Sequence, residues 1–192
     1  MTFVDVGAFR RSPLTAGRAS DTINKFFRHL SRVGGAEQIE ALELGSSPQL
    51  NPAEECLRLI QENISNISMH LPKGFVAGLN RQFANMMDDD AWESDDELIG
   101  RTAINSFLQT LLSTHTKRRP GIGTNGRGSI TATWTEGDNR LTIECLASGK
   151  ISVVLSRKQV TGEIERAAFG PTRPDRIRDL LAPFDPEIWF GC

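Results

Sequence analysis

The sequence predicts an α+β protein in which helices come first and a small antiparallel sheet follows. Apolar residues recur at helical spacing through much of residues 20–114, whereas they alternate with polar residues between 130 and 155. The alternating runs are joined by the short turn-forming segments EGDN (136–139) and ASGK (147–150). Helices followed by consecutive hairpins are typical of the α+β class, here with a β-meander of three or four strands and a C-terminal helix.

Residues 1–90 divide into an arm and a helical region. Residues 1–19 have no convincing period, so we expect an extended or partly disordered arm. Residues 20–90 are expected to be helical, with a first helix that Ser20 caps and Gly34-Gly35 ends. Asn51-Pro52 then begins a helix that runs to about residue 69. A shorter helix is predicted from about Phe75 to Met86-Met87.

Residues 91–192 are expected to hold one more long helix, the meander and a last helix. Ser94 and Glu97 have the S-x-x-E spacing of a capping box, which predicts a helix over 97–114. The glycine-rich segment 116–128 cannot continue that helix, and residues 121–126 within it are expected to be a flexible connector. Residues 159–169 are a weaker fourth strand, and Pro174 begins the final helix.

Composition excludes several classes of protein. The chain has 192 residues, 39% of them hydrophobic and 24% charged, as in an ordinary globular domain. No apolar stretch approaches the roughly 18–20 residues of a membrane span, and no secretory signal is visible. Cys56, Cys145 and Cys192 are far apart, which argues against a disulfide framework or a zinc site. We therefore expect a cytoplasmic protein without a metal or other cofactor.

Charge is segregated along the chain although its formal total is only −2. Residues 37–97 carry 13 acidic and 3 basic residues, whereas residues 1–36 and 98–192 each have a net charge of +4. Segment 88–97 alone has seven acidic residues. This segment could be a solvated loop without a binding function. The functional hypothesis is that it contacts a basic protein partner, with a tryptophan as the anchor. The candidate residues are Asp88, Asp89, Asp90, Trp92, Glu93, Asp95 and Asp96.

A second candidate contact is basic. Lys117, Arg118, Arg119 and Arg127 could bind an anion or a nucleic-acid phosphate. The G-x-G-x-x-G match at 121–126 follows a helix and precedes a strand, which is the reverse of a dinucleotide-binding loop. Trp134 is the one aromatic residue of the three clear strands and the chain has no tyrosine, so a base-stacking sheet is disfavoured.

Catalytic residues are not evident from the sequence. His29, His70 and His115 lie in different segments without a nearby carboxylate or nucleophile at a known spacing. Cys145 is expected to be an inert core thiol, and Glu144, on the opposite strand face, is expected to pair with a basic neighbour. We therefore expect a protein that is not an enzyme, although a site assembled only in space stays open as a third interpretation.

A set of motifs covers about a third of the chain. They are Trp92-Glu93, the helix 97–114, Pro120, Gly128-Ser129-Ile130 with Trp134, Leu141-Thr142-Ile143-Glu144, and Gly149-Lys150-Ile151. This pattern resembles that of small bacterial proteins of unassigned activity. The resemblance implies a helix packed on a β-meander and an antitoxin, immunity or phage-defence accessory role. It implies no catalytic residues.

The function expected from the sequence is therefore binding of a protein partner by electrostatic and apolar contacts. The alternative is an accessory protein that contacts nucleic acid through the basic segment 117–127.

Overall fold

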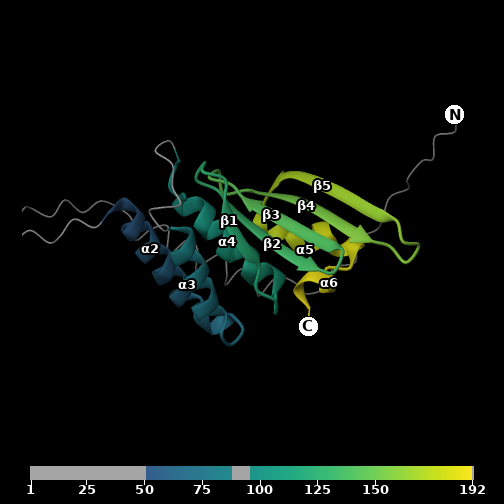
Figure 1. The fold of residues 1–192 in the computed structure, drawn as a ribbon, viewed down its shortest axis with the longest axis horizontal. Helices are drawn as coiled ribbons and strands as arrows, with labels where there is room; N and C mark the ends of the chain where they lie inside the picture. The colour runs from purple at the N-terminus through teal and green to yellow at the C-terminus, as the bar shows by residue number, and fades with distance from the viewer. Residues whose placement is uncertain (1–50, 88–95, 192) are drawn as a thin grey trace, which may run out of the picture. The chain divides into compact units, whose positions relative to one another are not determined.

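A computed structural model describes residues 51–87 and 96–191, all of which belong to one compact unit, Ser46–Cys192. The predicted α+β class is confirmed: helices precede an antiparallel sheet, and short helices follow it (Figure 1). The elements are α2 (Pro52–Asn66), η1 (Ser68–His70), α3 (Phe75–Met86), α4 (Arg101–Thr114), β1 (Gly121–Thr124), β2 (Ile130–Glu136), β3 (Asn139–Cys145), β4 (Ile151–Lys158), β5 (Ile164–Thr172), η3 (Pro174–Arg176), α5 (Ile177–Leu181), η4 (Ala182–Phe184) and α6 (Glu187–Phe190). The predictions for 1–19 and for the helix after Ser20 lie outside the described residues.

Helix α2 begins where the sequence predicts. The side-chain oxygen of Asn51 accepts a hydrogen bond from the backbone N–H of Ala53, and Glu54 accepts one from the backbone N–H of Asn51, both at 3.2 Å. Pro52 occupies the first helical position, where no backbone N–H donor is needed. These contacts satisfy amide groups that would otherwise be left without partners at the helix start.

The sheet is a continuous antiparallel meander in the order β1-β2-β3-β4-β5. Side chains alternate between its two faces, and the central strands bury one set completely. The buried set is Ile130, Ala132, Trp134, Leu141, Ile143, Cys145, Ile151, Val153 and Leu155. Helix α4 and the C-terminal helix α6 both contact β2 and β3. The other face of the sheet, here called the open face, is turned towards the reader in Figure 1.

Aromatic pairs join the helices to each other and to the sheet. The rings of Phe83 in α3 and Phe107 in α4 meet edge to face with their centroids 5.7 Å apart. Trp134 in β2 and Phe190 in α6 pack in the same manner at 5.2 Å. Such pairs stabilise beyond the area that they bury, by roughly 0.5–1.5 kcal/mol each. The core therefore continues from the α3–α4 contact to the buried face of the sheet.

The predicted start of the long central helix is wrong. Helix α4 begins at Arg101, and its N-cap residue is Gly100. Glu97 therefore lies before the helix. The backbone N–H of Glu97 instead donates to the carbonyl of Gly126 at 2.8 Å, and that of Gly100 donates to Gly128 at 3.0 Å. Backbone pairing with the glycine-rich segment thus replaces the capping box predicted from Ser94, which lies outside the described residues.

The prediction of a flexible connector at 121–126 is also wrong in part. Gly121–Thr124 forms β1, which pairs with β2 in the register Gly121↔Thr133 to Thr124↔Ile130. The sheet therefore has five strands, one more than the upper estimate from the sequence. The weak strand predicted over 159–169 is confirmed as β5, although it begins only at Ile164 and continues to Thr172.

Candidate binding surface on the open face of the sheet

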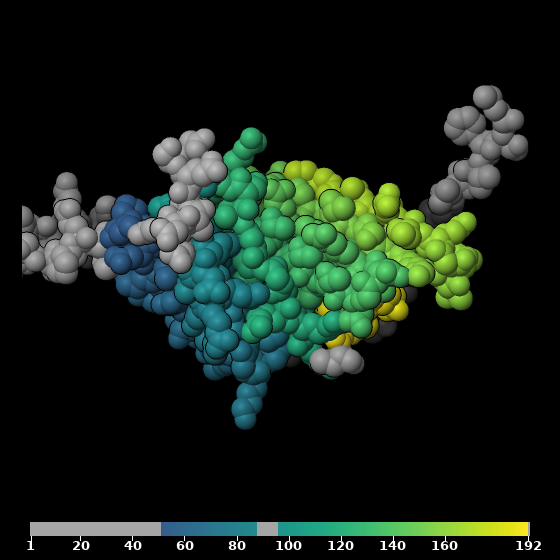
Figure 2. Space-filling view, in the orientation of Figure 1, coloured from purple at the N-terminus to yellow at the C-terminus, as the bar shows by residue number. Residues whose placement is uncertain are grey.

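The open face carries small polar side chains and few large ones. Its members come from alternate positions of β2 to β5 and are paired across the sheet by the strand register. They are Thr131, Thr133, Thr135, Arg140, Thr142, Glu144, Ser152, Val154, Ser156, Lys158, Ile164, Arg166 and Ala168. In Figure 2 the green atoms of these strands form a broad exposed surface. This face is stable in contact with water because most of its side chains are polar.

Two arginines flank a shallow hollow on this face. The hollow has a volume of about 420 Å³ and is lined by Arg140, Thr142, Val154, Leu155, Ser156 and Arg166. Arg140 lies opposite Ser156, which lies opposite Arg166, so the three residues form one row across β3, β4 and β5. Because neighbouring strands are about 4.8 Å apart, the Cα atoms of the two arginines are separated by roughly 10 Å.

The charge of these two arginines is not neutralised within the described part of the chain. Neither guanidinium group makes an ion pair or a hydrogen bond with a residue of 51–87 or 96–191. On the other face of the sheet, Arg157 binds the carboxylate of Glu165 at 2.8 and 3.2 Å. As far as the described residues show, the open face therefore keeps two unpaired guanidinium groups beside serine and threonine hydroxyls.

Asp138, in the turn between β2 and β3, is paired with a lysine rather than with Arg140 or Arg166. Asp138 accepts a hydrogen bond from the ammonium group of Lys158 at 2.8 Å. This hydrogen bond and the charge attraction lower the pKa of Asp138 and raise the pKa of Lys158. Both side chains are solvent-exposed, so the pair contributes little to stability, but it leaves Asp138 committed to Lys158 rather than to an arginine.

Glu144 makes no ion pair with a basic residue of 51–87 or 96–191. One oxygen of Glu144 accepts hydrogen bonds from the amide of Asn125 at 2.9 Å and from the hydroxyl of Ser129 at 3.2 Å. Both donors lie on the connection between β1 and β2. Glu144 therefore holds that connection against β3. The prediction of a cross-strand ion pair is wrong, because neutral side chains donate to the carboxylate instead.

The acidic candidate residues 88–95 lie outside the described residues, and only Asp96 is described. Its carboxylate lies against Gly126: a Cβ added to that glycine would be 2.1 Å from Asp96 Oδ1. The backbone of Glu97 pairs with the same segment. The described end of the acidic segment thus packs against the glycine-rich connection between β1 and β2.

The four basic candidate residues do not form one cluster. The guanidinium of Arg118 binds the carboxylate of Glu136 and donates to the carbonyl of Ile188 at 3.2 Å. That of Arg119 lies over α3, since a Cβ at Gly78 would be 1.5 Å from its Nη1 atom. Lys117 has an exposed side chain and donates its backbone N–H to Phe190 at 2.8 Å.

Arg127, the fourth basic candidate, lies beyond the other end of β1. Strand β1 therefore separates it from the other three along the chain. Trp134, the aromatic residue considered for base stacking, is buried, and its indole N–H donates to the carbonyl of Arg118 at 2.9 Å. No aromatic side chain of the described residues is presented on the open face.

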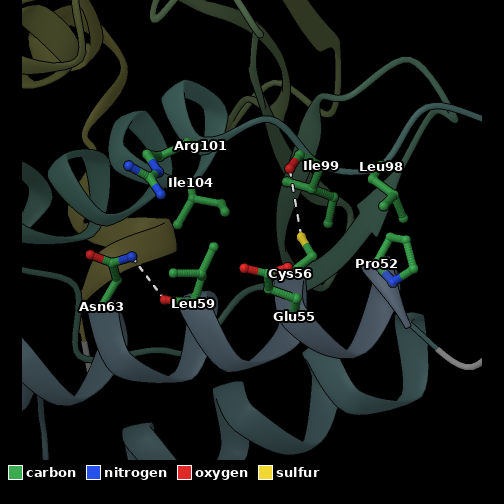
Figure 3. Close-up of a pocket in the computed structure, with 9 residues that line it drawn as sticks. All are labelled: Pro52, Glu55, Cys56, Leu59, Asn63, Leu98, Ile99, Arg101 and Ile104. Atoms are coloured by element: carbon green, nitrogen blue, oxygen red, sulfur yellow. Dashed lines mark hydrogen bonds between the residues drawn. The ribbon is translucent and has the colours of Figure 1, made fainter. Parts of the chain in front are cut away.

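A second hollow lies between α2 and the residues that lead into α4 (Figure 3). It has a volume of about 230 Å³ and is lined by Pro52, Glu55, Cys56, Leu59, Asn63, Leu98, Ile99, Arg101 and Ile104. The thiol of Cys56 donates to the carbonyl of Ile99 at 3.6 Å, and burial raises the pKa of this thiol. Both effects favour the unreactive thiol over the thiolate, so this hollow offers no activated nucleophile.

The described residues hold no cluster of potential metal ligands. The imidazole groups of His70 and His115 are exposed and make no hydrogen bond or ion pair within the described residues, and His29 lies outside them. Within 51–87 and 96–191 no group of three histidine, cysteine or carboxylate side chains could hold a metal ion. In the same part of the chain no helix is long and apolar enough to cross a membrane.

Cys145 is buried as predicted, and its burial has a measurable consequence at high pH. Desolvation, opposed by a hydrogen bond with Thr110, raises the pKa of the Cys145 thiol from 9.0 to about 12. Between these values the unfolded chain loses this proton while the folded chain keeps it, so stability falls as pH rises. We expect about 1 kcal/mol of stability to be lost between pH 8 and pH 10.

Urea unfolding of the wild type and of Cys145→Val at both pH values measures this loss of stability. Between pH 8 and pH 10 the wild type should lose that amount of stability relative to Cys145→Val, because the variant lacks the thiol. An unchanged difference would show that the thiol ionises equally well in the folded protein.

Sequence reasoning missed Arg140 and Arg166. The available signal was their position: each lies at a polar position of an alternating strand, and two hairpins bring them into one row. Only the register of β4 and β5 fixes that row. Comparisons of this chain with protein-family models, with curated proteins and with solved structures find no match.

Proposed function

We propose that this protein acts by binding another protein and that the open face of its sheet is the contact surface. The observation that supports this proposal is the open face itself, which combines a shallow hollow, free arginines and exposed Val154, whose relative exposure is 56%. A broad surface with a few apolar and arginine side chains is suited to a protein partner. A shallow hollow is less suited to a small substrate, which is usually enclosed by its pocket.

The remaining part of the proposal comes from the sequence. The acidic segment 88–97, with Trp92, is a second contact for a basic region of the partner. The resemblance to small bacterial proteins makes an antitoxin, immunity or phage-defence accessory role the most coherent setting for such binding.

Site-specific photo-crosslinking tests the proposed function. A benzoylphenylalanine placed at Val154 on the open face should give a discrete covalent adduct with a second protein in cells of the native host. The same group placed at Met69, which is 82% exposed in η1, is the control for nonspecific capture. Mass spectrometry then identifies the adduct.

An adduct from position 154 that is absent from position 69 supports the proposal. Equal adducts from both positions, no adduct from position 154, or an adduct with nucleic acid would each contradict it.

A further inference from the structure

We propose that the row formed by Arg140, Ser156 and Arg166 binds an acidic segment of the partner protein. This inference rests on the proposed function, because it names the chemistry of the partner that the open face would bind. The two guanidinium groups bind carboxylates, and the hydroxyl group of Ser156, which lies between them in the row, donates a hydrogen bond to the same segment.

The geometry of the row favours two carboxylates over one. The Cα atoms of Arg140 and Arg166 are roughly 10 Å apart, because one strand lies between them. Side chains on the same side of an extended peptide are about 7 Å apart, and flexible arginines can adjust to that separation. Each arginine can form a bidentate pair with a carboxylate, which gives both strength and orientation.

The charge of the open face favours an anionic partner. Arg157 is paired with Glu165 on the buried side of the same hairpin, whereas Arg140 and Arg166 have no carboxylate partner in the described residues. The two arginines, on either side of β4, repel each other in the free protein. An acidic segment would remove that repulsion on binding.

An acidic protein segment suits this surface better than nucleic acid does. The open face presents no aromatic side chain of the described residues on which a base could stack. It also carries Glu144, and a phosphate backbone needs a longer run of cations than two arginines supply. Nucleic-acid binding is therefore an alternative outcome of the test.

The experiment uses defined probes and the full chain. A fluorescein-labelled peptide of eight residues that alternates glutamate with serine is titrated with protein at 50 mM salt, and fluorescence anisotropy gives the affinity. The matched peptide has glutamine in place of glutamate, and a labelled 12-nucleotide oligothymidylate is the nucleic-acid probe. We expect the glutamate peptide to bind at least tenfold more tightly than either of the other two probes and to weaken as salt increases.

Charge reversal then locates the contact. The double variant Arg140→Glu with Arg166→Glu should bind the glutamate peptide at least tenfold more weakly. The control pair, Arg81→Glu with Arg178→Glu, makes the same change of net charge at exposed positions of α3 and α5 and should change affinity less than twofold. Lysine at both 140 and 166 keeps the charge but loses the bidentate fork, so an intermediate loss is expected even if the glutamate variant fails to fold.

Three results would overturn the acidic-segment proposal: equal loss in the control pair, full affinity in both the glutamate and the lysine variants, or tighter binding of the oligothymidylate. The proposed function fails separately. If position 154 crosslinks to a protein whose binding does not depend on Arg140 and Arg166, the acidic-segment proposal is wrong and protein binding stands. If the peptide binds at the arginines but position 154 captures no protein, protein binding itself loses its support.

Discussion

Replacing Phe107 with alanine should lower the free energy of unfolding by about 3–5 kcal/mol. The Phe107 side chain is fully buried in α4 and contacts the ring of Phe83 edge to face. Its removal takes away a large apolar surface and leaves a cavity between α3 and α4, which the surrounding helices can fill only partly. The loss is a large part of the 5–15 kcal/mol that stabilises a typical domain.

Urea unfolding of the full chain, followed by far-ultraviolet circular dichroism, measures this effect. Met69→Ala is the matched control, because Met69 is also a large apolar residue but is 82% exposed, and its loss should cost no more than about 0.5 kcal/mol. A loss below about 1 kcal/mol for Phe107→Ala would mean that α3 and α4 do not pack through this residue.

The second large effect is expected at Gly128, where we predict a loss of about 2–3 kcal/mol on replacement by alanine. Gly128 has φ +69°, a left-handed conformation that costs other residues roughly 1–2 kcal/mol. An added Cβ would also lie 3.3 Å from the carbonyl oxygen of Leu98. The hydrogen bond from Gly100 to Gly128 would be strained, and with it the pairing of residues 97–100 to the glycine-rich segment.

Gly137→Ala separates these two causes. Gly137 also has a positive φ, +56°, but nothing lies within 4 Å of an added Cβ. Its replacement should cost only the free energy of placing alanine in a left-handed backbone conformation. Gly128→Ala is therefore expected to be more destabilising than Gly137→Ala by about 1 kcal/mol. Equal costs for the two variants, measured by urea unfolding, would show that close packing against Leu98 is not significant.

Local sequence patterns predicted most of the fold because they act over a few residues. Asn51 and Pro52 specify a helix start by satisfying nearby amides, and the alternation in β2, β3 and β4 specifies which side chains are buried. The turns between these strands are short, so consecutive strands pair as a meander without further information.

The errors arose where distant backbone groups pair. Strand β1 contains two glycines and no apolar alternation, and it forms because β2 offers it a pairing edge. Glu97 has the spacing of a capping residue, but its backbone joins the segment after β1 instead. In both cases the deciding hydrogen bonds join residues far apart in the sequence, which a local pattern does not encode.

The candidate site was missed for a related reason. The sequence drew attention to runs of like charge, at 88–97 and 117–127, because adjacent charged residues are conspicuous. The free arginines of the open face are 26 positions apart and become neighbours only through the pairing of β3, β4 and β5. By contrast, Arg118 belongs to a conspicuous run but is bonded to Glu136 and to α6.

Binding of a partner protein by the open face is tested by the affinity of Val154→Asp for the protein crosslinked from position 154. We expect at least a tenfold loss of affinity relative to the wild type, because a charge replaces an apolar contact in the middle of the surface. Met69→Asp makes the same chemical change at an exposed residue of η1 and should leave affinity within twofold. Equal affinity of the wild type and Val154→Asp, with both proteins folded, would contradict the claim.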